Sequence, residues 1–364
     1  MTEARPANHD RINLRFEHET QPQRVLFGSG SAAANVADEV ERLGATAVMV
    51  IASETERAFT DRLAADIPVA LRYSDIVMHV PVEVADRARA AAAEHGIDLL
   101  LCVGGGSTTG LAKAIALTTG LPIIAVPTTY AGSEATNVWG LTDGGMKTTG
   151  VDARVLPRVI VYDAALTLSL PVPMSSASGL NALAHCVDSM WAPRTDPIDQ
   201  AIAAEGIRAL RLGLPAVVDD PSGLDGREHT LYGAYLAAVA FASAGSGLHH
   251  KICHVLGGKY NLPHAQTHAI VLPHVLAFNA PAAPDAERRL AAAFDADRAI
   301  DGLQALRTRL DAPNALRDIG FRRDDIPAAA AAILPAVPVN NPTPVTTDNL
   351  ERLLLAAWDG ADPR

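Results

Sequence analysis

The sequence predicts an α/β domain with a parallel sheet, followed by an all-α domain. The chain has 364 residues, which is too long for one ordinary core and fits two domains of roughly 150 to 200 residues each. In the first half, short apolar runs rich in β-branched residues alternate with alanine-rich segments, the pattern of parallel strands covered by helices. In the second half, strand signals nearly vanish and helical periodicity dominates.

Apolar runs and alternating periodicity set the expected elements of the first half. The strands are expected at 45–52, 97–103, 121–127 and 158–163, and the helices near 30–43, 82–95 and 107–119. The stretch LSLPVPMSS (168–176) has two prolines in a turn-like context and marks the domain boundary. We therefore assign 1–172 to the N-terminal α/β domain and 173–364 to the C-terminal helical domain. Its helices are expected at about 175–192, 197–212, 226–243, 248–257, 284–294, 299–311, 323–334 and 347–358.

Composition and charge exclude several classes of protein. Hydrophobic residues make up 49% of the chain and charged residues 20%, which is globular rather than disordered. The net charge of −11 argues against a nucleic-acid partner, because binding phosphates needs a basic face. The cysteines Cys102, Cys186 and Cys253 form no CxxC pair, so neither a disulfide framework nor a zinc ribbon is expected.

The polar start of the chain has no apolar leader-like core, and no later stretch reaches ~18 uninterrupted apolar residues. We therefore expect a cytoplasmic protein that does not span a membrane. Roughly the first 15 residues are interpreted as either a loose tail or an arm on a partner subunit.

A glycine turn follows the apolar run LLLCV. Gly104, Gly105, Gly106 and Ser107 precede a helical segment that contains Lys113. Glycines let a backbone approach a pyrophosphate, and the N–H groups at a helix start stabilise its charge. The pattern is neither a Walker loop nor GxGxxG, and a tight turn without a ligand explains it equally well.

Two further loops are candidates for the same site. In VLFGSGSAAANV (25–36), a glycine pair precedes a helix, which indicates either a cofactor loop or a simple turn. PTTYAGSEAT (127–136) follows a strand and supplies the hydroxyls of Thr128, Thr129, Tyr130 and Ser133. Ligands of open parallel sheets bind at the carboxyl ends of the strands, which favours a binding role for this loop.

The second half contains a histidine cluster. Asn181 and His185 are four residues apart, as are His250 and His254, and His264 follows. Spacing of i to i+4 puts each pair on one helix face, so inward-facing histidines form either a metal site or a polar catalytic pocket. His249, His268 and His274 are expected to be structural.

Four motifs occur in the order and spacing of the iron-containing alcohol dehydrogenase superfamily. They are GGGS with the following Lys113, PTTYAGSE, GLNALAH and HHKICHVLGGKYNLPH. The chain resembles that superfamily from about Arg24 onward, which implies its dehydroquinate synthase-like architecture: a nucleotide-binding α/β domain, then an all-α domain. In the family, an Asp, a His four residues later and two further His fourteen apart hold a divalent metal. The matching positions are Asn181, His185, His250 and His264, and His254 matches the additional histidine beside the nicotinamide.

Asn181 departs from the family pattern. An amide oxygen is neutral, so the site loses a charge and much of its affinity for Fe²⁺ or Zn²⁺, although three histidines could in principle still hold zinc. Three other features resemble the branch of the family that reduces maleylacetate without a metal. They are the segments KTTGVDARVLPRVIVYD and NNPTPVT, and Gly110, a position where metal-dependent relatives usually have Asp. The resemblance implies NADH- or NADPH-dependent reduction of this dianion to 3-oxoadipate in aromatic-compound catabolism. It also implies a homodimer.

The resemblance also implies residue roles. The cofactor-binding positions are Gly104, Gly105, Gly106, Ser107, Thr128, Thr129, Ser133, Ser53 and Lys147. The substrate-binding positions are Asn181, His185, His250, His254 and His264, and the catalytic candidates are His254, His250, His264, His185 and Tyr130. His254 is the first choice as proton donor, with Tyr130 and Lys251 as alternatives.

The residue at position 53 bears on the choice of cofactor. Ser53 stands where NAD-selective relatives often place Asp, so NADPH is expected to be accepted along with NADH.

Three other functions remain open. A metal-dependent alcohol or polyol dehydrogenase is the main rival, and Asn181 counts against it. A lyase resembling dehydroquinate synthase would need the intact carboxylate ligand, and the remaining alternative is a nucleotide-binding protein without catalysis.

Overall fold

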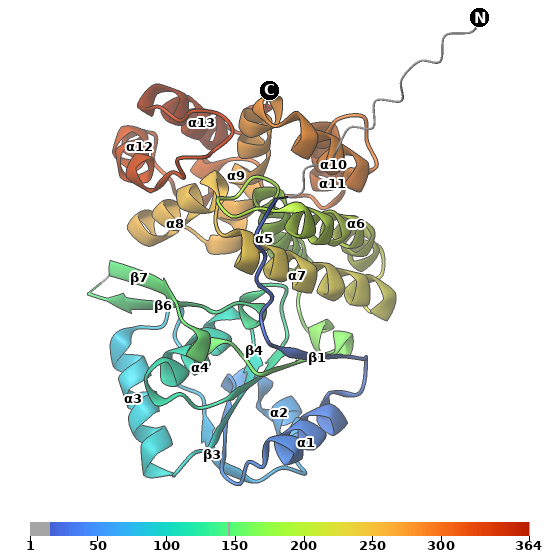
Figure 1. The fold of residues 1–364 in the computed structure, drawn as a ribbon, viewed down its shortest axis with the longest axis vertical. Helices are drawn as coiled ribbons and strands as arrows, with labels where there is room; N and C mark the ends of the chain where they lie inside the picture. Colours follow the sequence, from blue (N-terminus) through green and yellow to red (C-terminus); the bar gives the residue numbers. More distant parts are fainter. Residues whose placement is uncertain (1–14, 145, 364) are drawn as a thin grey trace, which may run out of the picture.

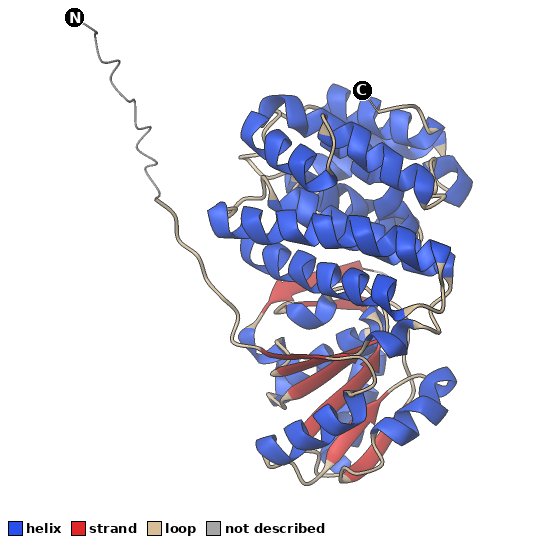
Figure 2. Ribbon diagram, turned by 90° about the vertical axis from the view of Figure 1, so that its right-hand side faces the viewer, coloured by secondary structure: helices blue, strands red, loops and turns tan. Residues whose placement is uncertain are grey.

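The computed structural model describes residues 15–144 and 146–363, with the sheet in one half and a stack of helices in the other (Figure 1). Most of the N-terminal segment interpreted as a tail or arm lies outside the described residues. Figure 2 shows the two halves stacked along the long axis, with the strands confined to one of them.

A parallel sheet with strand order β1-β8-β5-β4-β2-β3 organises the first half. The expected strands are present as β2 (Val48–Ile51), β4 (Leu99–Gly104), β5 (Ile123–Pro127) and β8 (Val159–Tyr162). The two edge strands, β1 (Arg24–Phe27) and β3 (Val69–Tyr73), were not predicted. Their side chains are exposed or only half-buried and include Arg24 and Arg72, so the strands lack a continuous apolar run. The antiparallel hairpin of β6 (Val138–Asp143) and β7 (Met146–Val151) was not predicted either.

Helices cover both faces of the sheet. One face packs against α3 (Val82–Glu94) and α4 (Gly106–Thr119), with Leu111 and Ile115 in contact with the side chains of the central strands. The other face packs against α1 (Ala32–Leu43) and the short α2 (Arg57–Leu63). Burial on both faces explains why the central strands are continuous apolar runs.

After β8 the described residues form helices and turns, without a further strand. The helices are α5 (Val172–Ser189), α6 (Pro197–Asp219), α7 (Leu224–Ala244), α8 (Leu248–Tyr260), α9 (His264–Asn279), α10 (Pro284–Phe294), α11 (Ala299–Arg309), α12 (Ile326–Ile333) and α13 (Thr347–Asp359). The sequence analysis missed α9, in which Pro273 lies inside the helix. The predicted fold class is confirmed, while the boundary at residue 172 stays a prediction.

Within the described residues, no single helix has the length and hydropathy to cross a membrane. The pair α7 and α8 meets the criterion only when taken together, and the two helices are bent by 100° relative to each other.

Candidate active site

The glycine turn lies between the last residue of β4 and the start of α4. Gly104 has φ +148°, a conformation that residues with a side chain rarely adopt, and a Cβ there would lie 2.5 Å from Thr108 Oγ1. A Cβ on Gly105 would lie 3.0 Å from Thr129 Cγ2. No side chain caps the first turn of α4. The turn therefore packs closely against the loop after β5, and among the described residues no side chain satisfies the N–H groups at the start of α4.

Glu56 joins two predicted cofactor residues beside this turn. Thr128 Oγ1 donates to Glu56 Oε1 at 3.0 Å, and Ser53 Oγ donates to Glu56 Oε2 at 2.8 Å. The backbone N–H of Thr128 donates to Gly104 O at 3.1 Å. The sequence analysis missed Glu56, although an acid three residues beyond Ser53 at the end of a central strand was a usable signal.

Lys113 has a structural role in the same region. Its buried ammonium group donates to the backbone oxygens of Ser133, Thr136 and Val138 at 2.6, 2.8 and 2.8 Å. These bonds hold the backbone of the segment that follows β5 in place, so Lys113 stabilises the conformation of that loop. Lys147 lies in β7, and its side chain is outside what the structure describes.

The loop after β5 connects the sheet to α5. The backbone N–H of Tyr130 donates to Ser178 Oγ at 3.2 Å, and Asn181 and His185 follow on the same helix. The Tyr130 side chain itself is buried, with its hydroxyl near Thr167 Oγ1. The structure therefore does not bring that hydroxyl into the histidine cluster, and its catalytic role stays a prediction.

Predicted histidines from two helices meet in one cluster. The rings of His185 on α5 and His250 on α8 stack with centroids 4.8 Å apart and planes at 15°. Phe241 of α7 lies against both, at 4.6 and 4.5 Å. The His254 ring lies 6.1 Å from that of His250. His185 and His250 are buried, whereas His254 is exposed, so this cluster runs from the core to the surface.

His264 joins the cluster through a neighbour on its own helix. Its ring lies 4.3 Å from that of His268, which in turn lies 5.0 Å from that of His250. Asn181 is buried on α5, and its Oδ1 has no hydrogen-bond partner among the described residues. The structure therefore groups the predicted substrate-binding residues of α5, α8 and α9.

Asp188 orients His250, and the sequence analysis missed it. Asp188 Oδ2 lies 2.7 Å from His250 Nδ1 and also accepts a bond from the Gly247 backbone N–H at 2.8 Å. Burial raises the pKa of Asp188, while the backbone N–H donors of Gly247 and His250 oppose this effect. When Asp188 is a carboxylate, Nδ1 of His250 carries the proton and Nε2 is left with its lone pair. Asp188 follows His185 by three residues on α5, and i to i+3 spacing was the available signal.

Burial controls the protonation of these rings. Loss of hydration holds the pKa of His185 and of His250 well below its usual value, and the neighbouring histidines add to the effect. The same causes lower the pKa of His249 and of His268. At neutral pH the buried part of the cluster is therefore uncharged and offers hydrogen bonds rather than positive charge.

Comparison with known proteins identifies the family. The model of the iron-containing alcohol dehydrogenase family matches residues 22–164, and that of the C-terminal part of the Fe-containing alcohol dehydrogenase family matches residues 175–358. The chain belongs to the iron-containing alcohol dehydrogenase family and is an oxidoreductase of that family. The resemblance found in the motifs is thereby confirmed.

The chain is also similar to enzymes of one particular branch. It is 45% identical to the maleylacetate reductase of Sphingobium indicum over 96% of this chain and 99% of that protein. Among solved structures, the maleylacetate reductase of Agrobacterium tumefaciens is 42% identical, with a TM-score of 0.91 over 96% of this chain and 99% of the other. An iron-containing alcohol dehydrogenase from Corynebacterium glutamicum is 62% identical, with a TM-score of 0.95 over 96% and 98%.

The set of side chains at the four matching positions differs from the family's metal-binding pattern. In the described part of the chain, three His, Cys, Asp or Glu ligand atoms come within 4.8 Å of one another only at His249, Cys253 and His268 and at His18, Asp196 and Asp199. His185, His250 and His264 do not converge in this way, and the fourth position holds the neutral amide of Asn181. The four positions offer three imidazoles and a neutral amide, so they lack the negative charge that the family pattern supplies to its divalent metal.

Proposed function

We propose that this enzyme reduces the carbon–carbon double bond of maleylacetate with NADH or NADPH to give 3-oxoadipate, without a metal at the four family positions. One observation carries the proposal: Asn181 presents a buried amide where the family pattern has a carboxylate. The similarity to maleylacetate reductases over nearly the whole chain supports the choice of substrate.

The substrate's own structure explains why a metal can be dispensed with. Its double bond is conjugated to a ketone, so hydride from nicotinamide C4 adds to the alkene and leaves an enolate. The enolate takes a proton at the adjacent carbon, which requires hydrogen-bond donors and one proton donor rather than a Lewis acid.

The histidine cluster suits this chemistry. We assign proton delivery to His254, which lies at the exposed end of the cluster beside His250. His250, His264, His185 and Asn181 bind the substrate and the developing negative charge. A bound dianion would favour protonation of neighbouring imidazoles and would offset the effect of burial.

The glycine turn and the loop after β5 are assigned to the cofactor. The uncapped start of α4 faces the pyrophosphate, with Gly104, Gly105, Gly106 and Ser107 around it. Thr128, Thr129, Ser133, Ser53 and Lys147 complete the proposed cofactor site.

We further propose that both cofactors are accepted. A pocket of about 170 Å³ at the carboxyl ends of β2 and β3 is lined by Ser53, Arg57 and Arg72 together with Ser74 and Glu54. Arg57 pairs with Glu54 and Arg72 with Asp61, so a 2′-phosphate would compete with these carboxylates for the two guanidinium groups. Comparable kcat/KM for NADH and NADPH is expected, and a preference above ~100-fold for either would contradict it. Ser53→Asp should lower kcat/KM for NADPH by about 10-fold and leave that for NADH nearly unchanged, because the new charge repels the phosphate.

The family resemblance supports two proposals on state and location. We propose a homodimer that acts in the cytoplasm. Light scattering of the purified protein tests the first, since a monomeric mass would contradict it.

The function is tested by following the loss of NADH absorbance with freshly generated maleylacetate. The protein is first treated with EDTA and its metal content is measured. Rapid turnover without added metal is the expected result. Activity that appears only with Fe²⁺ or Zn²⁺ and an aldehyde would instead assign the chain to the metal-dependent alcohol or polyol dehydrogenases.

A further inference from the structure

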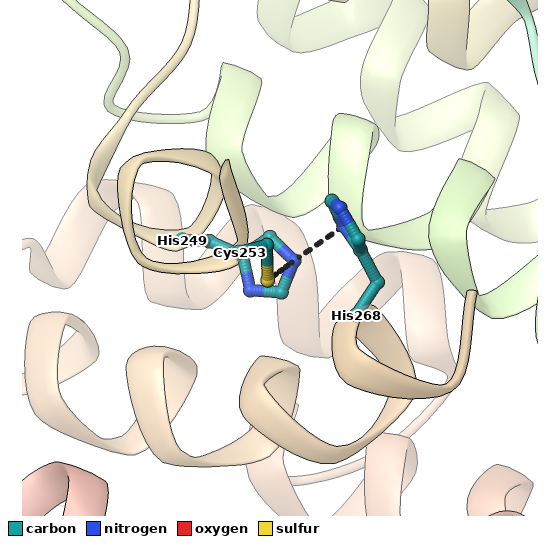
Figure 3. Close-up of side chains that lie close together, drawn as sticks. All are labelled: His249, Cys253 and His268. Atoms are coloured by element: carbon teal, nitrogen blue, oxygen red, sulfur yellow. Dashed lines mark hydrogen bonds between the residues drawn. The ribbon is translucent and has the colours of Figure 1, made fainter. Parts of the chain in front are cut away.

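A second group of ligand atoms lies behind the active-site histidines. His249 Nε2 and His268 Nδ1 are 2.9 Å apart, and Cys253 Sγ lies 3.6 Å from His249 Nε2. All three ligand atoms lie within 4.8 Å of one another. Figure 3 shows the three side chains close together, with dashed lines that join Cys253 to His249 and His249 to His268.

Helix geometry brings these residues together. His249 and Cys253 are four residues apart on α8, which puts them on one face, and His268 reaches them from α9. The exposed fractions of the three side chains are 0%, 1% and 0%. Because the backbones of two packed helices hold the donors, the arrangement does not depend on a surface loop.

Two of the three ligand-atom distances are close to those of a tetrahedral metal site. Zinc binds nitrogen at about 2.0–2.1 Å and thiolate sulfur at about 2.3 Å, so tetrahedral ligand pairs lie about 3.4 Å apart for N and N and about 3.6 Å apart for N and S. The distance from Cys253 Sγ to His249 Nε2 already has this value. The two ring nitrogens need to separate by about half an ångström, which small rotations of the imidazoles can supply.

We propose that His249, Cys253 and His268 bind one divalent cation of the zinc class, which cross-links α8 to α9. This site is distinct from the four family positions and uses softer ligands, two imidazoles and a thiolate, which suit Zn²⁺ or Co²⁺. On binding, the Cys253 thiol releases its proton to solvent and the sulfur forms a bond to the metal, with no redox change.

The cation would support the active site by fixing the helices that carry its histidines. The His249 ring lies 5.1 Å from that of His250, and His268 lies 4.3 Å from His264. Joining the two helices would therefore hold His250, His254 and His264 in place without contact with the substrate. This proposal is independent of the proposed reaction, which uses no metal as an electrophile.

Cobalt provides the test, because a thiolate bound to Co²⁺ gives a charge-transfer band in the near ultraviolet. EDTA-treated full-length protein is unfolded and refolded under reducing conditions with Co²⁺, so that burial does not block entry. The expected result is one Co²⁺ per chain with the sulfur band. Cys253→Ser should abolish the sulfur band, whereas Cys102→Ala, which removes a buried thiol in β4, should retain it.

The wild-type protein alone can overturn the proposal, even if Cys253→Ser fails to fold. Refolded wild-type protein that binds no Co²⁺, or binds it without the sulfur band, contradicts the site. A metal bound without sulfur and lost in His264→Ala would indicate the family positions and would count against the proposed metal-free reaction as well. Maleylacetate turnover, measured on the same samples, decides the reaction separately.

Discussion

The proposed cofactor loops and the histidine cluster are built in different ways. In the sheet half, the turn at Gly104 and Gly105 works through its backbone, and added atoms meet Thr108 and Thr129. In the helical half, ordinary helices carry the side chains, and in the proposed mechanism His185, His250 and His254 supply the chemistry themselves. The first site should therefore be damaged by adding atoms and the second by removing them.

The largest expected effect is the removal of the proposed proton donor. His254→Ala should lower kcat by ~10²-fold or more, because a positioned general acid contributes about that factor. Steady-state kinetics with maleylacetate measures it. His229→Ala, which removes an exposed histidine from α7, should leave kcat unchanged. A change confined to KM would assign His254 to binding.

The next effect tests whether side chains behind the cluster matter. Asp188→Asn keeps the size of the residue but lets an amide N–H face His250 Nδ1, which disturbs the tautomer and the ring orientation. We expect kcat to fall about 10- to 100-fold, as for other groups that orient a functional histidine. The pH profile of kcat should also shift.

A second buried carboxylate provides the control for Asp188. Asp199 lies in α6, and Asp199→Asn should leave both kcat and its pH profile unchanged. Equal losses in the two variants would reduce Asp188 to a structural residue.

In the sheet half, one added methyl group should act on cofactor binding alone. Gly105→Ala places a Cβ 3.0 Å from Thr129 Cγ2, so the loop after β5 must shift by a few tenths of an ångström. The KM for NADH should rise about 10-fold with a smaller change in kcat. Gly258→Ala, where an added Cβ meets no atom within 4 Å, is the control. An unchanged KM would show that the turn does not hold the cofactor.

The same contrast explains what the sequence could predict. The central strands and the turn at Gly104 were recognisable because buried parallel strands are apolar throughout and a tight turn needs glycine. The edge strand β3 carries Arg72 and was missed, because a half-buried strand lacks that signal. No helix was predicted for α9, where Pro273 is buried inside the helix although proline is unfavourable at such a position.

The partners of the site residues were harder to predict than the residues themselves. Asp188 and Glu56 act through contacts that only the folded chain creates, His250 to Asp188 across two helices and Thr128 to Glu56 across two loops. For Tyr130 the residue was predicted but its surroundings were not. Its backbone contacts α5, whereas its hydroxyl lies near Thr167 and away from the histidine cluster. A sequence shows which groups are present, and packing decides which of them face one another.

The smallest expected effect concerns stability at acid pH, which should depend on a buried histidine of the helical half and not on an exposed one of the sheet half. Burial, with Arg307 nearby, lowers the pKa of His274 on α9 from 6.5 to about 4. The folded state therefore binds fewer protons than the unfolded state below pH 6.5, so this stability is present above 6.5 and is lost as the pH falls toward 4. At pH 5 the loss is on the order of 2 kcal/mol.

His274→Gln should reduce the fall in Tm between pH 7.5 and pH 5, measured by calorimetry, whereas His95→Gln, on the exposed end of α3, should not. An equal fall in all three proteins would mean that other groups control the acid sensitivity of the helical half.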